Sequence, residues 1–528
     1  MSDRTSYSET YFQYLDALGV EVVSEMRGGV IEILEQTDWE NPKTELDCNN
    51  VGVMALIEAE RSDDGMMRSF YVEMAVDALQ QGGSHSLCQV HLALLQSMLG
   101  DRETACDISF NLILSALQPI SLLSDVPKGL MYRPLTWQIT SEDMQSWFAN
   151  MMEEQTAFAQ GLKLASEVLW RSQFVFYSPT GFRFLQLANQ TILSSVSINL
   201  RAGVSGIMNG AWESLMYLHR AAELAPQEMS VLQALHIAYR DLGQCQTAEH
   251  WLTTAQSLTS GNLHDASEQW TQVTAEQPNT YVAFDQEITL AVEPSFRSIV
   301  TSVLLAEGDW FEDEMEFWRH WLQPGMTVID VGANVGVYTF SAAKRVGSEG
   351  RVIAVEPFSG CIRCLEETRL VNQFDWVTIY AGAASDRNGT SYLSLNSASE
   401  LNELVAEENA PDGAEKVNCF TLDEICNREN LQQIDFLKID AEGHELSVLA
   451  GSKTLLAKFK PIILYENIAG SQGSNLEVTN YLKKEGYQIH GYQPFTKALI
   501  PLASLRDYQD RLNLIAWPQD LPLTQPVS

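Results

Sequence analysis

The 528-residue sequence predicts an α/β protein in two parts, an all-α region over residues 1–280 and a seven-stranded, mostly parallel sheet domain over residues 281–528. Two observations carry this prediction. In the first part, apolar residues recur at the spacing of amphipathic helices and almost nowhere alternate with the period of two that a strand needs. In the second part, short apolar runs ended by Gly, Asp or Glu alternate with helical stretches, which is typical of a parallel sheet covered on both faces.

The first part contains a repeated helix–turn–helix frame. Gly243 and Ala248 occupy packing positions of a repeat of about 34 residues, and Gly100 and Ala105 occupy the same positions in an earlier copy. Glycine ends one helix without a Cβ penalty, and the small alanine lets the next helix pack closely. The frame resembles degenerate tetratricopeptide (TPR) repeats, which bind peptides or proteins along a concave face. We therefore expect this region to bind substrate or a protein partner, or to form a homodimer.

The strands of the second part are expected where apolar runs end in turn residues or acids. These runs are TVIDVG, RVIAVE, VTIYAGA, IDFLKID, PIILYEN, YQIHGY and NLIAWP. Intervening segments such as YTFSAAKR have a helical pattern and would cover the sheet. We expect NLIAWP to form an antiparallel strand at the sheet edge.

Composition restricts the partners. The chain has 69 Asp plus Glu against 33 Lys plus Arg, a formal net charge of −36. Such a surface repels phosphate backbones and anionic lipid, so nucleic acid and membranes are not expected as partners. We find no apolar run long enough to span a bilayer and no signal-peptide pattern. Eight scattered cysteines do not form a disulfide framework, which favours a reduced, cytoplasmic protein.

A glycine-rich turn and an acid mark a nucleoside pocket. The DVGANVG turn (residues 330–336) follows the first strand of the sheet, and its Gly332 and Gly336 allow a tight turn and a close approach of the helix to a ligand. Glu356 ends the second strand, where an acid hydrogen-bonds a ribose diol. These features indicate an adenosyl ligand, but they do not separate a nicotinamide cofactor from S-adenosylmethionine.

The residues at the end of the fourth strand distinguish between these two cofactors. The sequence FLKIDAEGHE places carboxylates and a histidine at the pocket entrance. A dehydrogenase has no need of this cluster. Methyl transfer needs the sulfonium in line with a nucleophile, together with an acid or a metal that handles the hydroxyl proton.

With these motifs in place, residues from about 288 to 516 resemble the FkbM family of S-adenosylmethionine-dependent methyltransferases. The resemblance rests on five blocks: DVGANVG, VEP, TLDE, IDFLKIDAEGHELSVLAG and PIILYEN. It implies a Rossmann-like class I methyltransferase fold and transfer of a methyl group to a hydroxyl of a sugar or of a polyketide or peptide natural product, free or carrier-bound. The family's domain covers less than half of the chain, and the helical part is not explained by it.

The resemblance also assigns cofactor contacts. Around the cofactor it places Asp330, Gly332, Ala333, Asn334 and Gly336 at the methionine part, Glu356 at the ribose, Phe358, Ala383 and Ala384 at the adenine, and Asp440 at the pocket entrance. For the two alanines, plain sheet packing is an equal alternative.

The catalytic candidates are Asp440, His444 and Glu466. A neutral imidazole at residue 444 can accept a hydroxyl proton, although His444 could instead cap the following helix or bond Glu442. Asp440, Glu466 and Asn467 resemble the magnesium site of catechol-type O-methyltransferases. A Mg²⁺ ion there would bind a substrate diol and lower its pKa, whereas without a metal the same side chains would hydrogen-bond the substrate.

Two other functions remain open. An N-methyltransferase is disfavoured because base-methylating enzymes usually carry a (D/N)PP(Y/F) turn where this chain has DAEG. A non-catalytic scaffold with a degenerate methyltransferase domain is disfavoured by the intact turn, ribose acid and Asp440. Glu312, Glu314 and Glu316 precede the first strand of the sheet and are expected on a solvated helix face or in a lid.

Overall fold

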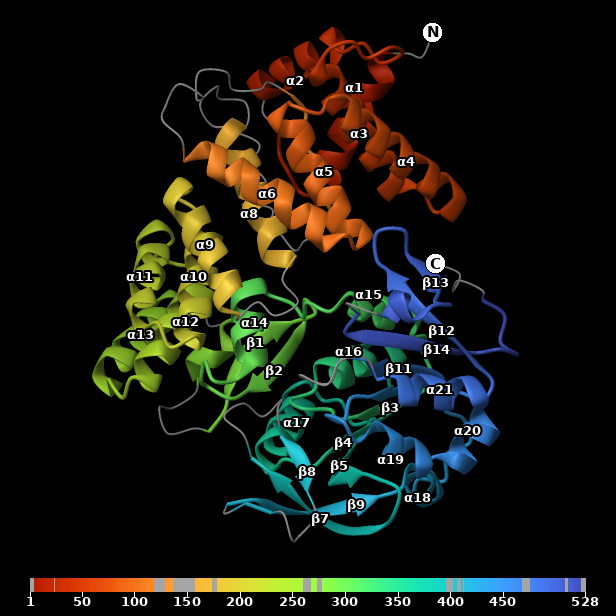
Figure 1. Ribbon diagram of the computed structural model, residues 1–528. Coiled ribbons are helices and arrows are strands. Elements are labelled where there is room, and N and C mark those ends of the chain that lie inside the picture. Colours follow the sequence, from red (N-terminus) through yellow and green to blue (C-terminus); the bar gives the residue numbers. More distant parts are fainter. Residues whose placement is uncertain are drawn as a thin grey trace. The chain divides into compact units, whose positions relative to one another are not determined.

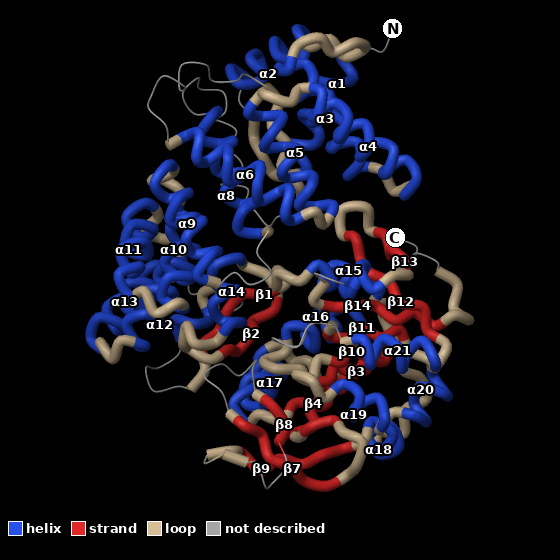
Figure 2. The backbone as a smooth tube through the Cα atoms, viewed as in Figure 1, coloured by secondary structure: helices blue, strands red, loops and turns tan. Residues whose placement is uncertain are grey.

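The chain divides into two compact units. A computed structural model assigns Met1–Leu224 with Phe495–Ala498 to the first unit, and Ala225–Pro494 with Leu499–Ser528 to the second. The structure describes residues 4–22, 24–117, 129–135, 157–172, 178–259, 267–272, 278–395, 402–405, 410–411, 413–467, 475–508 and 511–523. The change from helices to strands comes later than the division between units, at Thr280 (Figure 2).

The first unit is helical in all of its long described elements (Figure 1). Its helices are α1 (Arg4–Ala17), α2 (Ser24–Gln36), α3 (Glu45–Arg61), α4 (Gly65–Gln81), α5 (Ser86–Leu99), α6 (Arg102–Ala116), α8 (Ala157–Arg171), α9 (Pro179–Thr191), α10 (Val196–Met208), the 3₁₀ turn η2 (Trp212–Ser214) and α11 (Leu215–Leu224). One apolar cluster runs through α1 to α10, so these helices share a continuous core.

A segment without regular secondary structure, residues 129–134, is buried within the first unit. Side chains of the helices bond its backbone: the Leu130 carbonyl accepts from Asn49 Nδ2 at 2.9 Å, and the Tyr132 amide donates to His91 Nε2 at 3.0 Å. Burial lowers the pKa of His91 to about 3, so the ring is neutral and this nitrogen can accept. The segment is therefore held by specific polar contacts as well as by apolar packing.

The second unit is built on an eight-stranded sheet in the order β13-β12-β14-β11-β10-β3-β4-β5. Its strands are β3 (Thr327–Val331), β4 (Arg351–Glu356), β5 (Val377–Ala381), β10 (Phe436–Ile439), β11 (Ile462–Glu466), β12 (Tyr487–Gln493), β13 (Ala498–Pro501) and β14 (Asn513–Pro518). The five strands from β11 to β5 pair in parallel, and β14 pairs antiparallel with both β11 and β12.

The second unit also contains helices. They are α12 (Met229–Asp241), α13 (Cys245–Leu258), the 3₁₀ turn η3 (Gln269–Gln272), α14 (Ile299–Glu307), α15 (Asp313–Trp321), α16 (Val337–Val346), α17 (Ser359–Val371), α18 (Leu422–Arg428), α19 (Glu445–Ala450), α20 (Lys453–Phe459), α21 (Leu476–Lys484) and the 3₁₀ turn η6 (Leu505–Tyr508). Apolar side chains of α18 to α21 share one core cluster with β3, β4, β10, β11 and β14. These helices therefore pack on the sheet and stabilise the strands whose carboxyl ends carry the candidate residues.

The predicted helix pairs are confirmed. Gly100 follows α5 with φ +92° and Gly243 follows α12 with φ +70°, and each is succeeded directly by the next helix. At the first of these turns, Asp101 caps α6 by accepting from the Thr104 amide at 3.1 Å. The assignment of the helices to TPR repeats stays a prediction.

The α/β class is confirmed, with corrections at its margins. The strand NLIAWP was expected at the edge, but β14 lies between β11 and β12 and is buried along its whole length. A continuous apolar run fits such an inner position better than an edge. The main sheet was expected to have seven strands, and β13 is an eighth strand at its edge. Further strands form a hairpin, β1 (Thr280–Phe284) with β2 (Ile288–Val292), and a small sheet of β6 (Ala383–Ala384), β7 (Gly389–Ser394), β8 (Glu403–Val405) and β9 (Glu415–Phe420).

The parallel strands bring the candidate residues to one edge. Asp330, Glu356 and Glu466 lie in the last two positions of β3, β4 and β11, and Asp440 directly follows β10. Because carboxyl ends of parallel strands meet at the same edge, these acids face one region of the second unit. Among the described helices, no stretch is long and apolar enough to cross a membrane.

Candidate active site

The turn after β3 has a left-handed backbone conformation at three positions, which most residues with a side chain rarely adopt. Gly332, Asn334 and Gly336 have φ values of +72°, +50° and +102°. A Cβ atom on Gly332 would lie 1.7 Å from the backbone oxygen of Asp440, so only glycine lets β3 and β10 approach this closely. The Gly332 amide also donates to the Val355 carbonyl at 3.0 Å. The turn is therefore fixed between its two neighbouring strands.

Glu356 is the acid next to this turn. It is buried, and its two carboxylate oxygens accept from the Asn334 amide at 2.8 Å and from the Phe358 amide at 2.7 Å. Burial raises the pKa of Glu356 to about 7, and the two amides partly oppose the shift. Since an ionised carboxylate has about four acceptor positions, two remain for the hydroxyls of a ribose.

Asp330 lies beneath the same turn and is fully buried. Its Oδ2 accepts from the Thr339 hydroxyl at 2.6 Å, while its Oδ1 has no hydrogen-bond partner among the described residues. Burial raises the pKa of Asp330, and the nearby ammonium of Lys438 opposes that shift. An uncompensated buried oxygen is costly, so a ligand that donates to it would be favoured.

The residues predicted at the adenine lie around the tip of β4. Phe358 is half-buried at the N-terminus of α17. Ala383 and Ala384 form β6 and pair in parallel with β9, so they take part in sheet packing. The Gly382 amide just before them donates to the Glu356 carbonyl at 2.9 Å, which keeps the two alanines close to the ribose acid.

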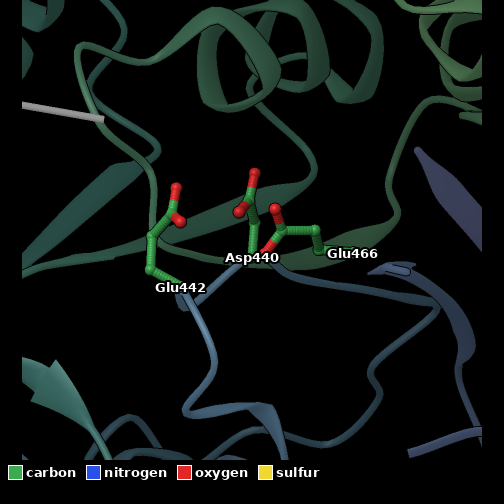
Figure 3. Close-up of side chains that lie close together, drawn as sticks. All are labelled: Asp440, Glu442 and Glu466. Atoms are coloured by element: carbon green, nitrogen blue, oxygen red, sulfur yellow. The ribbon is translucent and has the colours of Figure 1, made fainter. Parts of the chain in front are cut away.

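Three carboxylates form what we call the acidic tip: Asp440, Glu442 and Glu466. One oxygen from each lies within 4.8 Å of the others, and Figure 3 shows the Glu466 side chain pointing toward Asp440. Burial, followed by the charge of Asp440, raises the pKa of Glu442 to about 8 and that of Glu466 to about 10. Because carboxylates this close cannot all ionise, the tip favours a cationic ligand or shared protons.

His444 and Asn467, predicted beside these acids, make other contacts. The His444 ring bonds the Ser385 hydroxyl through Nε2 at 3.0 Å, and burial lowers its pKa. Asn467 is fully buried and donates its amide to the carbonyls of Tyr508 and Arg511 at 2.9 and 2.8 Å. The Asn467 Nδ2 group is therefore bound to the segment before β14, while its Oδ1 is buried without a hydrogen-bond partner among the described residues. The carboxylate of Glu442, which the sequence did not single out, joins Asp440 and Glu466 in the tip.

Sequence reasoning missed one residue of the site, Lys438, and named a second one, Glu312, without placing it in the site. Lys438 is buried within β10, and its Nζ lies 2.8 Å from Asp440 Oδ2. Glu312, expected on a solvated helix face or in a lid, accepts from the Tyr338 hydroxyl at 2.6 Å and from Asn513 Nδ2 at 2.9 Å. The signal for Lys438 was present, because a lysine interrupts the otherwise apolar run FLKI.

The fold and the site together define a class. The sheet has helices packed on it and one inner antiparallel strand, a glycine turn follows β3, and a buried acid ends β4; these features define a Rossmann-like fold in the C-terminal part of the second unit. More particularly, residues 330–489 match the family model of the methyltransferase FkbM domain. The C-terminal region of the chain therefore carries an FkbM-type methyltransferase domain.

Two curated proteins show sequence similarity. The chain is 26% identical over 213 residues to the AMB antimetabolite synthetase AmbE of Pseudomonas aeruginosa, covering 32% of this chain and 10% of that protein. It is 44% identical over 48 residues to ribosomal RNA large subunit methyltransferase E of Buchnera aphidicola, covering 9% of this chain and 23% of that protein. The chain thus matches only a tenth and about a quarter of the length of these relatives.

Solved structures similar to the chain include two methyltransferases. Methyltransferase FkbM from Methylobacillus flagellatus is 18% identical with a TM-score of 0.26, covering 42% of this chain and 53% of that one. A SAM-dependent methyltransferase from Aquifex aeolicus is 19% identical with a TM-score of 0.21, covering 34% of this chain and 81% of that one.

Proposed function

We propose that this protein is an S-adenosylmethionine-dependent O-methyltransferase. The observation that carries the proposal is the packing of the glycine turn against the Asp440 backbone beside the buried Glu356, within an FkbM-type domain. Glu356 would bind the ribose hydroxyls, Phe358 would lie against the adenine, and the turn would enclose the methionine part. The acidic tip would then lie near the sulfonium, whose positive charge its carboxylates favour.

The acidic tip supports oxygen over nitrogen as the methyl acceptor. An amine placed among carboxylates is held as an ammonium ion, which has no lone pair with which to attack the methyl group. A hydroxyl can instead donate to a carboxylate and keep a lone pair for attack. Asp440 and Glu466 would orient the hydroxyl, and His444 would receive the proton through Nε2 if the bond to Ser385 opens.

The acceptor would be a small or carrier-bound hydroxylated molecule, such as a sugar or a natural product. The net charge of −36 disfavours a phosphate-rich acceptor such as RNA. The similarity to an antimetabolite synthetase supports a natural-product acceptor. The helical unit would bind that acceptor, its carrier, a protein partner or a second copy of the chain.

A divalent cation is a further element of the proposal. Asp440, Glu442 and Glu466 offer hard oxygen ligands that suit Mg²⁺, which would lower the pKa of a bound hydroxyl. Glu442 adds a third carboxylate to the set expected from the sequence, and Asn467 stays a candidate through its Oδ1, because only its Nδ2 is engaged.

The test combines binding and transfer. Calorimetry should show S-adenosylmethionine binding to the wild type, and Asp440→Asn should reduce methyl transfer from labelled cofactor to a panel of hydroxylated acceptors. No heat and no thermal shift with cofactor would favour the scaffold alternative, and transfer to amines alone would favour N-methylation. Full activity after EDTA treatment, with no increase when Mg²⁺ is added, would rule out the metal.

A further inference from the structure

Lys438 is a buried cation in a central strand of the sheet. Its side chain is 4% exposed, and in the parallel ladder between β10 and β3 it lies opposite Asp330. Its neighbours in β10, Leu437 and Ile439, are fully buried and apolar. A lysine at this position is unusual, because a central parallel strand normally carries apolar side chains on both faces.

Several elements direct polar groups at this ammonium. Asp440 follows on the same strand, Asp330 comes from β3, Glu312 precedes α15, and the ring of Tyr338 from α16 lies 4.7 Å from Nζ. The charges of Asp440, Asp330 and Glu312 hold the pKa of Lys438 above its usual range despite the burial. The ammonium therefore lies next to the acidic tip and is bonded to one of its three carboxylates, that of Asp440.

Stability alone does not account for this arrangement. A buried ion pair recovers little more than its desolvation cost, and an apolar side chain of similar volume serves a central strand at least as well. What the ammonium does specifically is bond one oxygen of Asp440 at 2.8 Å, while the Asp440 side chain remains 30% exposed. A fixed and still accessible carboxylate is what an acceptor hydroxyl needs.

We propose that Lys438 is a positioning residue for methyl transfer, which acts by holding the Asp440 carboxylate in the orientation that receives the acceptor hydroxyl. This inference rests on the proposed function. It adds a residue that supports methyl transfer without touching the substrate. Lys438 acts through Asp440, so its effect on catalysis depends on that carboxylate being present. Glu312 and Asp330 balance the ammonium from the other side and keep it buried.

The test is a double-mutant cycle. Lys438→Met removes the charge while keeping an unbranched side chain of similar length. We expect kcat to fall about tenfold to hundredfold, as for other groups that orient a catalytic residue, while the Kd for S-adenosylmethionine stays near the wild-type value. In an Asp440→Asn background, the same substitution should cause little further loss, since the group that it orients is already altered.

A second variant keeps the cycle informative if the first does not fold. Lys438→Arg retains the charge and should recover part of the lost kcat, again only when Asp440 is present. A purely structural lysine would instead lower the thermal midpoint and reduce activity by the same factor in both backgrounds. That additive result, or a wild-type kcat in a folded Lys438→Met, would overturn the inference about Lys438 but leave the proposed function standing. Absence of methyl transfer by the wild type would overturn the proposed function as well.

Discussion

Substituting Gly332 by alanine tests whether the turn after β3 is built around the backbone of Asp440. An alanine at φ +72° carries a conformational cost of about 1–2 kcal/mol. Its Cβ would also lie 1.7 Å from the Asp440 carbonyl oxygen, so β3 and β10 must separate. Overpacking of this kind costs about 1–3 kcal/mol. The free energy of unfolding should therefore fall by about 2–5 kcal/mol.

Gly325→Ala is the matched control, because Gly325 also has a positive φ, +84°, but no atom within 4 Å of its added Cβ. It should lower the free energy of unfolding by only the conformational cost, about 1–2 kcal/mol. Denaturant unfolding measures both variants, and calorimetry measures their binding of S-adenosylmethionine. Gly332→Ala should bind the cofactor at least about tenfold more weakly, because the turn moves. Equal stability and affinity in the two variants would refute the close approach.

Further predictions concern the ribose acid, the histidine and the core of the helical unit. Because the pKa of Glu356 is raised to about 7 and the ionised form accepts hydroxyls, calorimetry should show affinity for S-adenosylmethionine rising from about pH 6 to 8 in the wild type, and a weaker, nearly pH-independent affinity in Glu356→Gln. A flat wild-type profile would contradict this role. His444→Ala should lower kcat by about a hundredfold or more if the ring is the base, whereas Ser385→Ala should keep most of it; wild-type turnover by His444→Ala would exclude the base. Arg133→Met should lower the free energy of unfolding by about 3 kcal/mol, because it leaves the buried Glu167 carboxylate without the guanidinium that lies 2.6 Å away; in denaturant unfolding, the double change with Glu167→Leu should recover most of that loss.

The order and type of the central elements could be predicted from local patterns. The parallel strands are mostly apolar runs that end in a turn residue or acid, with Lys438 in β10 as an exception, and the segments between them have the apolar spacing of helices. The place of β14 could not be predicted this way. Local pattern shows that NLIAWP is buried, but its neighbours depend on pairing with β11 and β12, which are distant in sequence.

The conformation of the glycine turn and the position of the acid beside it could be predicted from the sequence more fully than the acidic tip. Gly332 and Glu356 act through backbone geometry close to their own strand, so a short motif contains most of the information. The acidic tip depends on side chains from two strands and on a turn in which Glu442 has φ +48°. Sequence spacing could place Glu466 and Asn467 at the end of the same strand, but not reveal that Asn467 turns toward the segment before β14.

Part of the excess of acidic residues is concentrated at the strand ends of the second unit. At the strand ends, burial raises the pKa values of Glu356, Glu442 and Glu466, so these carboxyl groups keep their protons to higher pH than exposed carboxyl groups do. Binding of a sulfonium cation would favour the ionised forms and release protons into solution. Within the same site Lys438 already keeps one carboxylate, that of Asp440, paired with a positive charge. The site therefore contains one carboxylate that is paired with a lysine, that of Asp440, and three carboxyl groups whose raised pKa values a bound cation would lower.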